Sequence, residues 1–214
     1  MNERLWDACS YGNLLLVNLL VNDPAVNPNW VGPEKGDTPL HHACRFGHLQ
    51  IVEVLPKHPL IEANAGNAGE ASPFYIACQN GHVEIVKLLL ADMRTEINQS
   101  RNDSATPLFI ACHHGHKDAV SLLLAHPGID VNRPTSDKSS PFTPRFDGAT
   151  PFFIACRKGR QAVVSLLLAD QRVDINLAER CLPSPLDCLP RRPPSGDSTD
   201  LGLWKGSGHA DQVG

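Results

Sequence analysis

The chain has 214 residues, 42% of them hydrophobic, and carries a net charge of −4, so it can bury a substantial core and is neither a mini-protein nor a disordered chain. Its lysines and arginines are scattered, which argues against a nucleic-acid partner. No apolar run approaches the roughly 20 residues of a membrane span, and the first residues lack the apolar core of a secretory signal, so we expect a cytoplasmic or nuclear protein, neither secreted nor inserted in a membrane.

A short apolar motif recurs along the chain. Each copy contains Ala-Cys and then a glycine three residues after the cysteine, and the copies are Leu5 to Gly12, Leu40 to Gly47, Phe74 to Gly81, Leu108 to Gly115 and Phe152 to Gly159. The spacings between successive cysteines are 35, 34, 34 and 44 residues. A fixed period of this size is typical of a solenoid built from stacked repeats.

The residues around each motif predict two short helices per repeat. A hydroxyl residue followed by proline precedes four of the motifs, at Thr38, Ser72, Thr106 and Thr150, which is the N-cap and first-turn pattern of a helix. The glycine of the motif supplies the left-handed position that ends this helix. A second apolar run, such as Ile85 to Leu90, predicts a second helix that pairs with the first as an antiparallel hairpin. The polar segment between hairpins is predicted to project as a turn.

These motifs resemble the ankyrin repeat. The resemblance rests on Thr38-Pro39-Leu40-His41, on Ala43, on Gly47-His48 and on Asp130-Val131-Asn132, and it covers roughly residues 3 to 180. It implies an all-α solenoid over residues 1–182, with stacked antiparallel helix hairpins, projecting turns and a concave face lined by turns and first helices. The repeats are expected at about 3–36, 37–70, 71–104, 105–148 and 149–182.

Several positions depart from the family pattern. The histidine of the Thr-Pro-Leu-His motif occurs only at His41, so its hydrogen bond near the cap is expected to be lost in the later repeats. Pro56 stands inside the second helix of repeat two, where it should end or kink that helix at a cost of roughly 3 kcal/mol. An insertion lengthens the loop at 133–149, and we expect it to be a solvated loop, although Ser140-Pro141 and Thr143-Pro144 also fit proline-directed phosphorylation.

The sequence after repeat five does not continue the pattern. Residues 183–190 begin a sixth repeat in phase, but Pro190, Pro193 and Pro194 prevent its first helix from finishing. Residues 191–214 lack periodicity and are expected to be disordered. Repeat five is therefore expected to be left without a cap, which suggests either a fragment of a longer protein or self-association through this end.

Catalytic and metal chemistry find little support. Cys112, His113, His114 and His116 look like a zinc cluster, but Cys112 shares its position with the core cysteines and His116 shares its position with His48 and His82, so we expect no metal. The cysteine ladder is expected to be core packing, whereas Cys181 and Cys188 lie outside it. No phosphate loop, nucleophile elbow or kinase signature occurs, so we expect neither an enzyme nor a cofactor.

The resemblance assigns partner contacts to the position before each cap and to the outward side of each first helix. These partner-binding positions are Asp37, His42, Arg45, Phe46, Ala71, Ile76, Gln79, Asn80, Ala105, Ile110, His113, His114, Ala149, Ile154, Arg157 and Lys158. For Ile76, Ile110 and Ile154 two interpretations stay open: an exposed apolar row that binds a partner, or packing between neighbouring first helices.

The expected function is a non-catalytic protein-binding scaffold or adaptor, and arginines and histidines beside the isoleucine row favour an acidic and hydrophobic partner. The alternative is the repeat segment of a longer effector, such as a kinase, a channel or a ubiquitin-ligase subunit, whose active part is missing. A structural homo-oligomer built through the uncapped end is a third hypothesis.

Overall fold

The computed structural model describes residues 1–32, 35–136 and 148–180. This part of the chain is all helical and contains no strand. Its α-helices are α1 (Asn2–Tyr11), α2 (Leu14–Val21), α3 (Pro39–Phe46), α4 (Leu49–Val54), α5 (Pro73–Asn80), α6 (Val83–Ala91), α7 (Pro107–His114), α8 (Lys117–Ala125), α9 (Pro151–Arg157) and α10 (Gln161–Ala169). Two 3₁₀ helices, η1 (Leu55–Lys57) and η2 (Ile175–Arg180), complete the elements.

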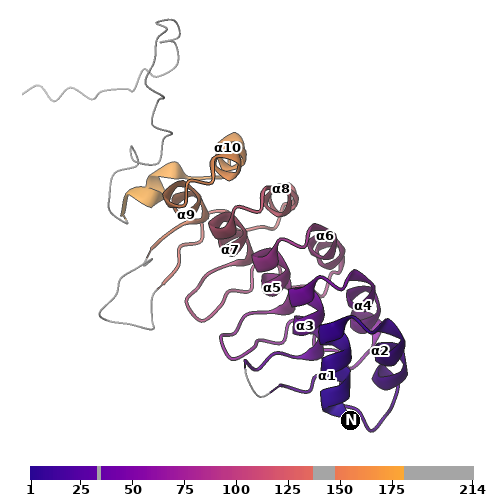
Figure 1. The fold of residues 1–214 in the computed structure, drawn as a ribbon. Coiled ribbons are helices and arrows are strands. Elements are labelled where there is room, and N and C mark those ends of the chain that lie inside the picture. Colours follow the sequence, from indigo (N-terminus) through magenta and orange to yellow (C-terminus); the bar gives the residue numbers. More distant parts are fainter. Residues whose placement is uncertain (33–34, 137–147, 181–214) are drawn as a thin grey trace, which may run out of the picture.

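The helices form five antiparallel pairs stacked in chain order. In Figure 1 the first helices of the pairs (α1, α3, α5, α7 and α9) form one row, the second helices form another, and the connecting turns project from the side of the first row. Neighbouring first helices contact one another along the whole stack. This is the architecture that the sequence predicts, an all-α solenoid of hairpins with projecting turns. Some predictions concern residues 137–147 and 181–214, which lie outside the described residues. They are the Ser-Pro and Thr-Pro sites, the aborted sixth repeat, the tail, Cys181 and Cys188.

The predicted helix starts are confirmed, and so are the predicted helix ends except that of α9, whose C-cap is Lys158, one residue before Gly159. The side chains of Ser72, Thr106 and Thr150 each accept a hydrogen bond from the backbone N–H three residues later, at 3.1 to 3.2 Å. The α5 helix then ends at Gly81, whose φ of 70° lies in the left-handed region. Helices α1, α3 and α7 end at glycines of the same conformation. The hydroxyl, the proline and the glycine thus set the length of these first helices.

Pro56 shortens the second helix of repeat two, as predicted. The α4 helix stops at Val54 after six residues, and the chain continues as the 3₁₀ turn η1, which contains Pro56. The corresponding helices α6, α8 and α10 each have nine residues. The carbonyl of Pro56 accepts a hydrogen bond from the Arg94 guanidinium of the next repeat at 2.5 Å, so repeat three satisfies a group at the shortened end.

A contact between successive repeats recurs at the end of each first helix. The Nε2 atoms of His48, His82 and His116 lie 2.9 to 3.0 Å from backbone carbonyls of the preceding first helix. The same rings cover the helix-ending glycine of the preceding repeat. A Cβ built on Gly81, for example, would lie 2.5 Å from His116 Nδ1. Arg160 replaces the histidine in repeat five, and nothing in the described part lies within 4 Å of a Cβ built on Gly159.

Asparagines make the corresponding contact between the projecting turns. Asn64 donates from Nδ2 to the Arg94 carbonyl at 2.6 Å, and its Oδ1 accepts the N–H of Glu96 at 2.9 Å. The same pair of bonds links each turn to the next repeat at Asn29, Asn98 and Asn132. Both functional groups of each amide are therefore used inside the stack.

The core consists of the apolar faces of both helix rows. Cys9, Cys44, Cys78, Cys112 and Cys156 are buried. Burial raises the pKa of the Cys9 thiol to about 12, and it raises the pKa of Cys44, Cys78 and Cys112 further. The cysteine ladder is therefore core packing, as the sequence predicts, and its thiols are not poised to react.

Among the equivalent positions of the five repeats, only that of repeat two holds a histidine, His41. The His41 side chain connects two repeats. Its Nδ1 accepts the N–H of Thr38 at 3.1 Å, which requires this nitrogen to be unprotonated, and its Nε2 donates to the Ala71 carbonyl at 2.8 Å. The ring is fully buried, and this burial lowers the pKa of His41. The equivalent Tyr75, Phe109 and Phe153 fill the space by burial, while a hydroxyl still caps their helices.

Alanine substitutions at two left-handed glycines should differ in cost. Gly159→Ala is expected to lose about 1–2 kcal/mol, because only the left-handed conformation penalises the methyl group. Gly81→Ala should lose clearly more, because the methyl group also displaces the His116 ring. Urea unfolding monitored by circular dichroism measures both variants. Equal losses would contradict the packing role of the histidine.

The contribution of His41 should depend on pH. At pH 8, His41→Phe is expected to reduce the free energy of unfolding by about 1–3 kcal/mol, because buried partners lose their hydrogen bonds. The folded-state pKa of His41 lies below its ordinary value of 6.5. The stability that His41 contributes should therefore be fully present above pH 6.5 and should decrease as the pH falls from 6.5 to the folded-state pKa. Urea unfolding of both proteins between pH 8 and pH 5 measures the gap, and a constant gap would refute the assignment.

Candidate functional site

The candidate site is the first-helix face, defined as the exposed side chains of the last turns of α1, α3, α5, α7 and α9 together with the adjoining projecting turns. The sequence assigns sixteen positions to this face, and the structure divides them by burial. Asp37, Ala71, Ala105 and Ala149 are at most 3% exposed. The assignment of these four side chains to partner contact is therefore wrong, because they pack under the turns and present no surface.

The isoleucine row is also buried. Ile76, Ile110 and Ile154 are 3%, 8% and 0% exposed. The first helices pack side by side, so this position on each helix faces its neighbour and not the solvent. Of the two interpretations of the row, the exposed apolar stripe is wrong and packing between first helices is correct. His42, at the same position in repeat two, is 9% exposed and contacts the Trp6 ring at a centroid distance of 3.9 Å.

Eight of the predicted positions do reach the surface. Phe46, Asn80, His114, Arg157 and Lys158 are exposed, and Arg45, Gln79 and His113 are half-buried. They come from the last turns of α3, α5, α7 and α9, so the stack brings them together on one face. The structure adds Tyr11 of α1, which is 83% exposed at the position equivalent to Phe46. The repeat register could have identified Tyr11 from the sequence.

The chemistry of this face changes along the stack. The last helical position holds an aromatic ring in the first two repeats, Tyr11 and Phe46, and then Asn80 and His114, and Lys158 follows directly after α9 in repeat five. The second half of the face is therefore cationic and imidazole-rich, while the first half is aromatic. A partner with an apolar part and an acidic part would match both halves in one orientation only.

Asp37 forms the centre of a buried polar cluster behind the face. Its carboxylate pairs with the Arg45 guanidinium and accepts a hydrogen bond from Asn67 Nδ2 at 2.8 Å. Burial alone would raise the pKa of this carboxyl, but the bonds from Asn67 and Arg45 outweigh burial and hold the pKa below its ordinary value. The acid therefore orients Arg45. The sequence signals this role, because Asp37 stands at a position where repeats three, four and five have alanine.

Of the three histidines His113, His114 and His116 in repeat four, His116 has a structural role. His113 and His114 have ring centroids 4.8 Å apart, and His116 stacks on His114 at 5.8 Å. His116 Nε2, however, bonds to the Gln79 carbonyl between repeats. Burial first, and then neighbouring positive charges, lower the pKa of His113 and His114. Among the described residues no group of three histidines, cysteines or acids is placed to hold a metal ion.

In the described ranges no helix is both long and apolar enough to cross a bilayer. A family model described as ankyrin repeats (3 copies) matches the chain over residues 5–101, 56–135 and 93–179. No curated protein matches the sequence.

Because the isoleucine row is buried, an aspartate there should disrupt the fold and not only the surface. Ile154→Asp is expected to cost about 3–5 kcal/mol, since a carboxylate would be buried without a partner. The matched control is Lys158→Asp, which places the same residue at an exposed position at the end of α9 and should change stability by less than about 1 kcal/mol. Thermal unfolding compares the two, and similar melting temperatures would place Ile154 at the surface after all.

Proposed function

The chain belongs to the ankyrin repeat family, and we propose that it is a non-catalytic protein-binding scaffold or adaptor that uses the first-helix face. Ankyrin repeats are generally protein-interaction modules. The observation that carries the proposal is the row of five exposed side chains, one from the last helical position of each repeat or the residue next to it, that ends in Lys158. A cytoplasmic or nuclear location belongs to the same proposal.

The structure supports a surface that is formed before the partner arrives. The first helices α3, α5, α7 and α9 are capped at their starts by a hydroxyl residue. The ends of α1, α3, α5 and α7 are each tied to the next repeat by an imidazole or a guanidinium. Because these bonds hold the helix ends in place, association immobilises few additional groups, and less conformational entropy is lost on binding.

The order of side chains along the face suggests the chemistry of the partner. Tyr11 and Phe46 offer exposed aromatic surface, and aromatic residues are enriched at protein interfaces. At the other end, Arg157 and Lys158 are exposed cations, and the charge of Lys158 acts on the imidazole of His114. The protein partner that fits is a segment or domain with an apolar region followed by acidic residues.

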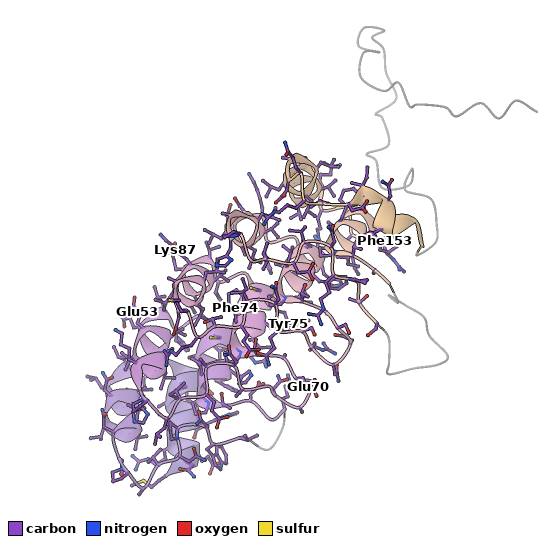
Figure 2. The ribbon with its side chains drawn as sticks, turned by 180° about the vertical axis from the view of Figure 1, so that it is seen from behind. Glu53, Glu70, Phe74, Tyr75, Lys87 and Phe153 are labelled. Atoms are coloured by element: carbon purple, nitrogen blue, oxygen red, sulfur yellow. The ribbon has the colours of Figure 1, made fainter. Side chains whose placement is uncertain are left out.

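A partner-capture experiment tests the proposal with two matched double variants. Phe46→Glu/Lys158→Glu changes the first-helix face, whereas Leu15→Glu/Lys87→Glu makes a comparable change at exposed sites on the second helices. Figure 2 shows Lys87 and Glu53 on the second-helix side, away from Glu70 in a projecting turn. Proteins captured by the wild type should be lost with the first variant and kept with the second, after circular dichroism shows that both fold.

Capture that survives the change at the first-helix face, or that is lost equally with both variants, would contradict the proposal. In the first case the partner binds another surface. In the second case the loss reflects the added negative charge and not the position of the substituted residues.

The surface of repeat five favours a second function, which is docking of this end onto a further structural element. Leu168 is 54% exposed, whereas the equivalent Leu124 and Leu90 are half-buried. Within the described ranges, Gly159 has no covering side chain of the kind that Gly12, Gly47, Gly81 and Gly115 have. A further structural element would bury this end. It could be part of a longer effector protein or a second copy of the chain. Sedimentation equilibrium of the wild type and of Leu168→Asp distinguishes these, because only self-association makes the mass depend on concentration.

A further inference from the structure

A hollow of about 370 Å³ opens at the first-helix face, where the projecting turns before α3, α5 and α7 follow one another. Three cations line it: Lys35 and Arg101 from the turns and Arg45 from the last turn of α3. No acidic residue is among its lining residues. Tyr75 and Ile76, both nearly fully buried, form the base of the hollow, where the Tyr75 hydroxyl interacts with Arg101, and the half-buried Gln79 adds an amide.

The positive charges in the hollow are only partly balanced by the chain. Arg45 pairs with Asp37, which is 2% exposed and lies outside the lining. Arg101 has a longer contact, 3.5 Å from its Nη2 to Asp103 Oδ2. No ion pair of Lys35 occurs within the described ranges, and its side chain is exposed. Among the described residues, two aspartates therefore balance three cations, which leaves one cationic group of the hollow without an acidic partner there.

The donors of Arg101 are also incompletely used. A guanidinium has five N–H donors, and the Nε of Arg101 is buried without an acceptor in the described part of the chain. Gly69 lies beside it, because a Cβ built on Gly69 would be 3.7 Å from this Nε. The φ of Gly69 is not in the left-handed region, so the backbone would tolerate alanine, and the missing side chain leaves room next to the guanidinium.

We propose that this hollow binds the carboxylate of an aspartate or glutamate side chain of the protein partner, between Lys35 and Arg101. The proposal rests on the proposed function and specifies one contact of it. A single negative charge matches the single unbalanced positive charge, whereas a doubly charged phosphate would exceed it.

Fluorescence anisotropy with a labelled hexaglutamate peptide tests the contact, and labelled hexaglutamine is the uncharged control. The wild type should bind only hexaglutamate. Lys35→Gln/Arg101→Gln should weaken binding about tenfold or more, as the loss of charge-assisted hydrogen bonds predicts. Lys87→Gln/Lys117→Gln removes the same charge from exposed positions on the second helices and should change the affinity less than about twofold.

Two further variants distinguish binding in the hollow from a general effect of charge and from a change in folding. Gly69→Ala should weaken binding with no change in charge, because the methyl group occupies space beside Arg101. Lys35→Gln alone keeps the test valid if Arg101→Gln disturbs the turn, since the Lys35 side chain is exposed.

The proposal is overturned if both glutamine double variants weaken binding equally, or if hexaglutamate does not bind while partner capture by the first-helix face succeeds. It is also overturned if inorganic phosphate displaces the peptide at a lower concentration than acetate does, since the hollow would then favour phosphate. Failure of partner capture itself contradicts the proposed function, so the two failures are distinguishable.

Discussion

The structure depends on contacts between successive repeats, because one helix hairpin cannot bury its own apolar face. In this chain the contact is specific at two places. An imidazole, or Arg160 in repeat five, reaches back to a carbonyl of the preceding first helix, and an asparagine of each turn bonds to the next. Both contacts satisfy backbone groups that would otherwise be left at helix and turn ends. The spacing and direction of the first helices follow from them.

These contacts also decide which polar groups remain for a partner. His41, Asn64 and His116 use their polar atoms inside the stack, and Asp37 is occupied in orienting Arg45. On the first-helix side, the polar groups that remain lie at the last turns of the first helices and in the hollow beside Arg101. The proposed scaffold function and the proposed carboxylate site thus concern the groups that the repeat contacts leave unused.

The sequence predicts much of this fold because its signals are local. Hydroxyl and proline mark the helix starts, glycine marks the helix ends, and Pro56 shortens α4 where it stands. The burial of Ile154 and of Asp37 was not predictable in the same way. Whether a side chain on the outward part of a helix faces solvent or the neighbouring helix depends on the rotation between repeats, which no motif encodes. The hollow likewise joins residues from three separate segments, Lys35, Arg45 and Arg101.

The uncovered glycine of repeat five has a consequence for how the stack opens. In a linear array each repeat is stabilised by its neighbours, so an end repeat has one stabilising interface where an inner repeat has two. In the described part of the chain, Gly159 and Leu168 mark such an end. Amide hydrogen exchange would therefore be faster in α9 and α10 than in the inner repeats, with fraying that proceeds inward toward repeat four. The cationic end of the first-helix face lies on these helices, so a ligand bound there would slow exchange across repeat five and couple recognition to local folding.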